Sequence, residues 1–279
     1  MRPPLSPLPM LEPPDPVREA LAPELLALLA RTQEAPDAPP ASLRERLARR
    51  VAESAAAAAA MHTVRADRTP FAAIAPGVRA LVLHAHDASR ALRAGEPLAA
   101  RLIELAPGSR WAGPDAGVHH EWLVLRGSAT VGGETLAERD FQVVPAGQPS
   151  LPVASAEGAL LFLRESPLAA QPGDRPITVR DAGAPWPDFA PGIRRRVLWE
   201  RDGEAAMLYF TDPGAMVPNH SHGHDEECLM VQGELYLDDV LLRAGDYQLA
   251  PAGTGHRITE TDTGVVIYAH GDLDLRFVG

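Results

Sequence analysis

The most informative segment of the chain is GAMVPNHSHGHDEECLMVQG, residues 214–233. Its His220 and His222 are two positions apart, so in a strand both side chains point to the same face. Glu226 has the same parity, and a turn at Gly223 could still bring it to the same centre. The segment therefore predicts three ligands that converge on one point.

A second segment, GDYQLAPAGTGH at residues 245–256, supplies a fourth ligand. It is typical of a strand that ends in a Pro-Ala-Gly turn, and His256 begins the next strand. Three imidazoles and one carboxylate suit Zn, Fe, Mn, Ni or Cu, and they do not suit Ca or Mg. We therefore expect one divalent transition metal ion per chain, with its identity left open by the residues. The expected ligands are His220, His222, Glu226 and His256.

Three neighbours of these ligands have roles that the sequence leaves partly open. Cys228 shares the parity of Glu226, so it either lies near the metal with a redox or ligand-contacting role or packs as a small apolar side chain. His224 is explained better as a loop residue that supports the ligands than as a fifth ligand. Glu227 is expected to face away from the metal and to be structural.

The chain contains an internal repeat of whole-domain length. PGVRALVL at 76–83 resembles PGIRRRVL at 191–198, and further on a gap-free offset of 106 pairs the Pro-Ala-Gly of 145–147 with that of 251–253. An insertion near 84–96 in the first copy explains the difference between the two offsets. The repeat predicts three parts, which are a Pro-rich and helical segment (1–61), a first domain (62–172) and a metal-binding second domain (173–279).

The first copy keeps the fold positions and loses the metal ligands. The residues at the four ligand positions are Pro114, Ala116, His120 and Ser150. The first domain is therefore expected to be metal-free, and the alternative is an improvised site made of His119, His120 and Glu121. His84 and His86 also have H-x-H spacing, but at the edge of the insertion they are expected to be surface histidines.

The N-terminal segment is expected to contain two short helices. One follows Asp15-Pro16, which resembles an N-cap with proline at the first helical position. The other begins at the capping-box pattern of Ser42 and Glu45 and ends near Met61.

The two histidine-containing segments match the two motifs of the cupin superfamily, G-x5-H-x-H-x3-E-x6-G and G-x5-P-x-G-x2-H. The usual final Asn of the second motif is Glu260 here. The resemblance implies an all-β fold of two tandem cupin, or jelly-roll, β-barrels after a short α-helical N-terminal segment. It also implies that His220, His222, Glu226 and His256 hold the metal inside the second barrel.

The second repeat more specifically resembles the cupin domain of ChrR-family anti-sigma factors, over FAPGIRRRVL at 189–198 and the run from Asp212 to His256. This resemblance implies a regulatory or sensing protein that responds to an oxidant or a small ligand. The N-terminal zinc motif of that family, H-x3-C-x2-C, is absent, because the single cysteine is Cys228. The alternatives are a non-heme metal-dependent dioxygenase or related enzyme acting on a small molecule, and a scaffold whose metal is structural.

The composition of the chain limits the kinds of molecule that it is expected to bind. A net charge of -11 disfavours nucleic acid, which is itself a polyanion. No window offers about 18 consecutive apolar residues, so no membrane span is expected. One cysteine and an N-terminus without a leader's apolar core favour the cytoplasm. The expected partners are a small-molecule ligand, a second copy in a homodimer, and a protein bound through the N-terminal helices.

Overall fold

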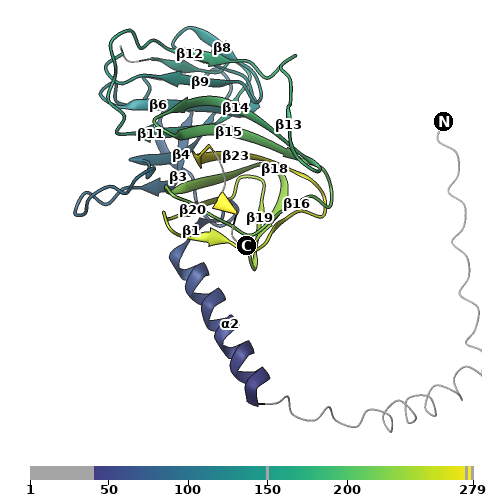
Figure 1. Cartoon of the computed structure of the whole chain (residues 1–279). Helices are drawn as coiled ribbons and strands as arrows, with labels where there is room; N and C mark the ends of the chain where they lie inside the picture. Colours follow the sequence, from purple (N-terminus) through teal and green to yellow (C-terminus); the bar gives the residue numbers. More distant parts are fainter. Residues whose placement is uncertain (1–40, 149–150, 274–275, 278–279) are drawn as a thin grey trace, which may run out of the picture. The chain divides into compact units, whose positions relative to one another are not determined.

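The computed structural model describes residues 41–148, 151–273 and 276–277 (Figure 1). The chain divides into two compact units, residues 1–53 and 54–279. The Pro-rich start and the helix expected after Asp15-Pro16 lie outside the described residues. The second expected helix is α2 (Ala41–Ala60). No helix in the described part of the chain is both long and apolar enough to cross a membrane.

The predicted all-β architecture of two tandem barrels is confirmed, and the first barrel is made of two sheets. In the described residues its larger sheet has seven strands in the order β12-β9-β6-β11-β4-β3-β2, and a four-stranded sheet in the order β5-β10-β7-β8 completes it. The bounds are β2 (Ala72–Ala75), β3 (Val78–Ala85), β4 (Ala99–Leu105), β5 (Arg110–Trp111), β6 (His119–Gly127), β7 (Ala129–Val131), β8 (Glu134–Leu136), β9 (Phe141–Val144), β10 (Val153–Ala154), β11 (Ala159–Ser166) and β12 (Ile177–Val179).

The second barrel repeats this plan. Its main sheet runs β1-β20-β18-β23-β15-β14-β13, with β16, β19 and β22 attached, and β21-β17-β24 form a small sheet. The bounds are β1 (His62–Val64), β13 (Asp188–Ala190), β14 (Ile193–Arg201), β15 (Glu204–Thr211), β16 (Met216–Val217), β17 (His220–Ser221), β18 (Glu226–Leu237), β19 (Val240–Arg243), β20 (Tyr247–Ala250), β21 (Gly255–His256), β22 (Thr259–Glu260), β23 (Val265–Asp272) and β24 (Arg276–Phe277).

The two barrels exchange a short strand each. β1 precedes the first barrel in sequence, yet it pairs antiparallel with β20 of the second barrel. β12 follows the residue 172 boundary, yet it pairs antiparallel with β9 of the first barrel. The chain therefore cannot be cut at residue 172 without breaking a sheet.

Strand alternation divides the apolar residues among three cores. One face of β6 and of β18 contributes Leu123 and Leu229 to a core that contains residues of both barrels. The opposite faces contribute Trp122 to a core inside the first barrel and Met230 to a core inside the second. Both faces of these central strands are covered, which explains why their sequences are nearly continuously apolar instead of alternating.

A buried ionic network lies between the barrels. The guanidinium of Arg164 on β11 donates to Glu121 of its own barrel at 3.1 Å and to Glu227 of the second barrel. Tyr247 donates to Glu227 at 2.7 Å and Tyr268 donates to Glu121 at 2.9 Å. Burial would raise the pKa of Glu121, but nearby positive charge from His270 and Arg164 holds that pKa well below its usual range. Glu227 thus faces away from the metal candidates, as the sequence predicted.

Candidate metal centre

The four predicted ligands come from three neighbouring segments of the second barrel. His220 on β17 is the register partner of His256 on β21. The backbone of His222 is held between two hydrogen bonds, from its N–H to Thr254 and from Gly253 to its carbonyl, at 3.0 and 2.9 Å. Glu226 is the first residue of β18. The Pro-Ala-Gly turn therefore places His256 beside the H-x-H pair.

Close approach of β17 and β21 requires a glycine. A Cβ atom at Gly255 would lie only 2.2 Å from the carbonyl oxygen of His220, which no side chain tolerates. The glycine before His256 is therefore needed to bring the two histidines into register.

The side chains of these four residues converge. The ligand atoms of His220, His222 and Glu226 all lie within 4.8 Å of one another, and all three residues are buried. The ring of His256 lies slightly farther out, with its centroid 5.7 Å from that of His220 and 5.3 Å from that of His222. His220, His222 and Glu226 are thus spaced as ligands of one ion, and the ring of His256 lies beside them.

The outer ring nitrogens of two histidines face oxygen atoms. His220 Nδ1 lies 2.9 Å from the carbonyl oxygen of Pro218, and His256 Nδ1 lies 3.5 Å from Oδ2 of Asp238. Metal-binding histidines usually present their second nitrogen to such an oxygen, which fixes the ring and leaves Nε2 free for the metal. Asp238 and Pro218 were not identified from the sequence, because neither belongs to a motif.

The electrostatics keep the imidazoles in the neutral form that binds metals. Burial, together with the neighbouring His256 and His220, lowers the pKa of His222 to about 3. Burial also lowers the pKa of His220. Burial raises the pKa of Glu226 to about 7. A cation at the centre would offset the cost of burying the Glu226 carboxylate.

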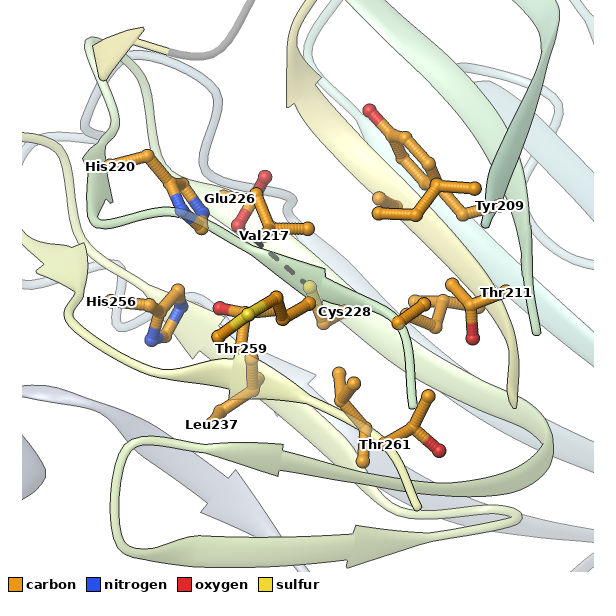
Figure 2. A pocket seen from close by; sticks show the side chains of 16 residues that line it. Tyr209, Thr211, Val217, His220, Glu226, Cys228, Leu237, His256, Thr259 and Thr261 are labelled. Atoms are coloured by element: carbon orange, nitrogen blue, oxygen red, sulfur yellow. Dashed lines mark hydrogen bonds between the residues drawn. The ribbon is translucent and has the colours of Figure 1, made fainter. Parts of the chain in front are cut away.

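A pocket opens beside this centre (Figure 2). The cavity volume is about 60 Å³, and His220, Glu226 and His256 are among the residues that line it. Figure 2 shows these three side chains at one end of the pocket and Tyr209 at the other. The candidate centre therefore borders a small apolar cavity with room for a few waters or a small ligand group, which a closed structural site would lack.

The comparisons with known proteins agree with this geometry. Residues 174–274 match the family model described as the ChrR cupin-like domain. The fold is similar to that of a candidate dioxygenase from Nostoc punctiforme, with a TM-score of 0.60, 16% identity, and coverage of 78% of this chain and 85% of that one. The chain has a bicupin fold. No curated protein sequence matches it significantly.

Two further solved structures share the bicupin fold. The protein Ylba from E. coli aligns with a TM-score of 0.58 at 16% identity, over 76% of this chain and 90% of that chain. A variant of the oxalate decarboxylase from Bacillus subtilis aligns with a TM-score of 0.55 at 16% identity, over 78% of each chain. At this level of identity the similarity establishes the fold alone.

Neither neighbour of the ligands becomes a fifth ligand. His224 Nδ1 pairs with Asp272, so its ring is occupied away from the centre. Cys228 lines the pocket and lies in the core of the second barrel, and its Sγ is 3.8 Å from Oε2 of Glu226. The thiol is therefore a wall residue of the second barrel that also faces the cavity.

The thiol of Cys228 is expected to be unreactive in the folded bicupin. Burial raises its pKa well above the usual value, and the carboxylate of Glu226 raises it further, so little thiolate forms. With a thiol reagent such as dithionitrobenzoate, we expect the native protein to react at least ~100-fold more slowly than the urea-unfolded chain. Similar rates in both states would show that the folded barrel does not shield the thiol from the reagent.

In the described residues of the first barrel, the alternative site of His119, His120 and Glu121 is not assembled. His119 and Glu121 face the inter-barrel network, with His119 Nε2 3.7 Å from Oε1 of Glu121. His120 points to the opposite face and lines a small cavity inside the first barrel. Strand alternation therefore separates the three residues of the improvised site. Ser150 lies outside the described residues.

His84 and His86 are not surface residues, so that expectation was wrong. Both side chains are about nine-tenths buried and contact the carboxylate of Glu96, at 3.3 and 3.5 Å. Glu96 also accepts hydrogen bonds from Arg90 and from the backbone of Arg93. The insertion is an ordered loop that folds around this carboxylate.

The insertion reaches from the first barrel to the metal loop of the second. Arg93 donates through Nε to Oδ2 of Asp225, the residue before Glu226, at 2.7 Å. The backbone N–H of Asp225 donates to the carbonyl of Ala94 at 2.8 Å. The other oxygen of Asp225 accepts the N–H of Ala252 at 2.8 Å, in the turn that precedes His256. Asp225 therefore joins the insertion to both ligand segments.

Loss of this clamp is expected to weaken the metal centre. Arg93→Ala removes the cation that orients Asp225, and outer-shell changes of this kind cost ~10–100-fold in metal affinity. Competition with a chelating dye would measure the change. The matched control is Arg79→Ala, which removes a more exposed ion pair with Glu104 elsewhere in the first barrel. Equal affinities of the two variants would rule out a role of the insertion.

Proposed function

We propose that the second barrel binds one divalent transition metal ion, such as zinc or iron, through His220, His222, Glu226 and His256. We further propose that it binds a small molecule at that ion, and that the protein uses this binding in a regulatory or sensing role. The observation that carries the proposal is the apolar cavity of about 60 Å³ that ends on three of the four ligands. The match of residues 174–274 to the ChrR cupin-like domain supports the regulatory role.

The predicted ligands have buried polar atoms that lack a hydrogen-bond partner and that a metal ion would satisfy. Nε2 of His222 and Nε2 of His256 are buried without a hydrogen-bond partner in the described part of the chain. Buried polar atoms are rarely left unpaired, because each costs about 1–3 kcal/mol. A divalent cation would satisfy both histidines and the Glu226 carboxylate together, and it would supply Lewis acidity or, as iron, oxygen chemistry.

A second candidate is a non-heme dioxygenase, the activity attributed to the similar protein from Nostoc punctiforme. It is favoured by the residue types at the centre, because three imidazoles and one carboxylate suit iron as well as zinc. The cavity beside them would give oxygen or a small compound access to such an ion.

Oxygen uptake separates the two candidates. Protein loaded with Fe(II) without oxygen is mixed with a small-molecule panel and then exposed to oxygen. A sensor is expected to consume at most about one equivalent per chain, because it does not regenerate its starting state. Sustained uptake over many equivalents with one compound would replace the regulatory proposal by the enzymatic one.

The remaining expectations stay proposals. A regulatory bicupin needs a partner, and the homodimer and the protein bound through the N-terminal helices are the two that we propose. The cytoplasm remains the proposed location, from the single cysteine.

A further inference from the structure

The two barrels of this chain differ in how their interiors are filled. At the offset of 106, Cys228 matches Trp122 and Val217 matches Trp111. In the first barrel the two indole rings pack edge to face, with centroids 6.2 Å apart, and Trp122 is 1% exposed. In the second barrel Cys228 and Val217 line the pocket instead. Part of the space that two indoles fill in one barrel is thus open in the other.

Three further pairs of matched positions show the same difference between the two barrels. Other pocket residues of the second barrel are smaller or more polar than their first-barrel counterparts. The pairs are Thr211 with Leu105, Thr259 with Val153, and Ala269 with Leu163. Both barrels keep the same strands, so the hollow arises from the side chains and not from a loosened fold. The first barrel therefore shows how this interior packs when larger side chains fill it.

The wall of the hollow is apolar away from the metal end. No lysine or arginine is among the described residues that line it. The hydroxyls of Thr211 and Thr261 already donate to backbone carbonyls, at 3.3 and 2.7 Å. The hydroxyl of Thr259 is buried without a partner in the described residues, and Figure 2 shows it on the same side of the pocket as His256. The polar atoms without a hydrogen-bond partner therefore lie at the end of the pocket that holds the predicted metal ligands.

We infer that the ligand of the second barrel has an aliphatic or aromatic body and a single oxygen-bearing head that binds the metal, and that it is not a small dicarboxylate. This inference rests on the proposed function, because the head needs the metal. An apolar body gains free energy by leaving water for this wall. A second carboxylate close to the metal end would be buried against aliphatic side chains, which is costly. The nearby cation Arg195 contacts Tyr209 at the opposite end of the pocket, out of reach of a short dicarboxylate. The ligand class thus differs from oxalate, the molecule named for the similar decarboxylase.

Three chelating probes test the ligand class on zinc-loaded protein by calorimetry. Benzohydroxamic and acetohydroxamic acid share one metal-binding head and differ in the phenyl body, and oxalate has two carboxylates and no body. We expect benzohydroxamic acid to bind ~10–100-fold more tightly than acetohydroxamic acid, as burial of a phenyl group predicts. We expect oxalate to bind no more tightly than acetohydroxamic acid.

Variants that refill the hollow should remove the phenyl advantage. Cys228→Trp restores the first-barrel residue, and Ala269→Leu is a smaller filling that keeps the test valid if the tryptophan variant fails to fold. Both should bring the two hydroxamic acids to similar affinities. The control is Val82→Trp, at a position 51% exposed on β3, which should keep the difference.

Metal content measured on the same samples shows whether a negative result concerns the ligand class or the metal site itself. Metal-loaded wild type that binds both hydroxamic acids equally, or oxalate most tightly, would overturn the ligand class while leaving the metal proposal intact. A phenyl advantage that survives both refilling variants would also overturn it. Failure of the wild type to take up zinc would overturn the proposed function, and the ligand class with it.

Discussion

Replacing His222 by alanine is expected to remove most of the metal from the second barrel, with a loss of affinity of at least ~100-fold. His222 is 3% exposed, and its Nε2 lies 3.3 Å from Oε2 of Glu226. Its imidazole is therefore central to the site. The neighbouring His224 cannot replace it, because its ring is paired with Asp272. Elemental analysis after dialysis, with a chelator titration for the affinity, measures the effect.

The matched control for this variant comes from the first barrel. His120 stands where Glu226 stands in the second copy, and it is also buried. His120→Ala should therefore keep the full metal content of the wild type. Equal metal loss in the His120 and His222 variants, or full retention in both, would contradict the assignment of the metal to the second barrel.

Replacing Arg164 by alanine is expected to lower the free energy of unfolding by about 3–5 kcal/mol, because it leaves two buried carboxylates without their cation. Glu121 and Glu227 are both fully buried, and Arg164 is the guanidinium that both of them contact. Arg164 also donates to the carbonyl of Gly95 at 2.9 Å, in the insertion. Urea unfolding followed by tryptophan fluorescence would measure the loss.

Two further variants test whether the effect of Arg164→Ala comes from the buried ionic network. Arg101→Ala removes a partly exposed ion pair with Glu165 in the first barrel, and it should cost at most ~1 kcal/mol. In the Arg164→Ala background, the pair Glu121→Gln and Glu227→Gln should recover part of the stability, because the uncompensated charges are gone. The network would lose its assigned role if Arg164→Ala were no more destabilising than Arg101→Ala.

Most of the candidate centre could be predicted from the sequence, because its signals are local. His220 and His222 share a strand face by parity, and the Pro-Ala-Gly turn indicates that His256 starts the next strand. The internal repeat adds a comparison within the chain, since Trp122 shows which side chain fills the place of Cys228. Those features depend on spacing and side-chain size, which the sequence states directly.

What could not be predicted depends on contacts between distant segments. The contact between Arg93 and Asp225 joins residues of different barrels, and no motif contains Arg93. The insertion was visible as a change of offset, but its folding around Glu96 was not, which is why His84 was expected at the surface. The exchanged strands β1 and β12 have three residues each, too few for a periodic pattern.

The central claim is that one of two homologous barrels holds a metal and the other has lost it. The most direct measurement is the number of transition-metal ions per chain, by elemental analysis of protein purified without added metal and then reconstituted with zinc. The account predicts one ion per chain. Two ions per chain would show that the first barrel binds metal as well, and none after reconstitution would show that His220, His222, Glu226 and His256 do not form a metal site.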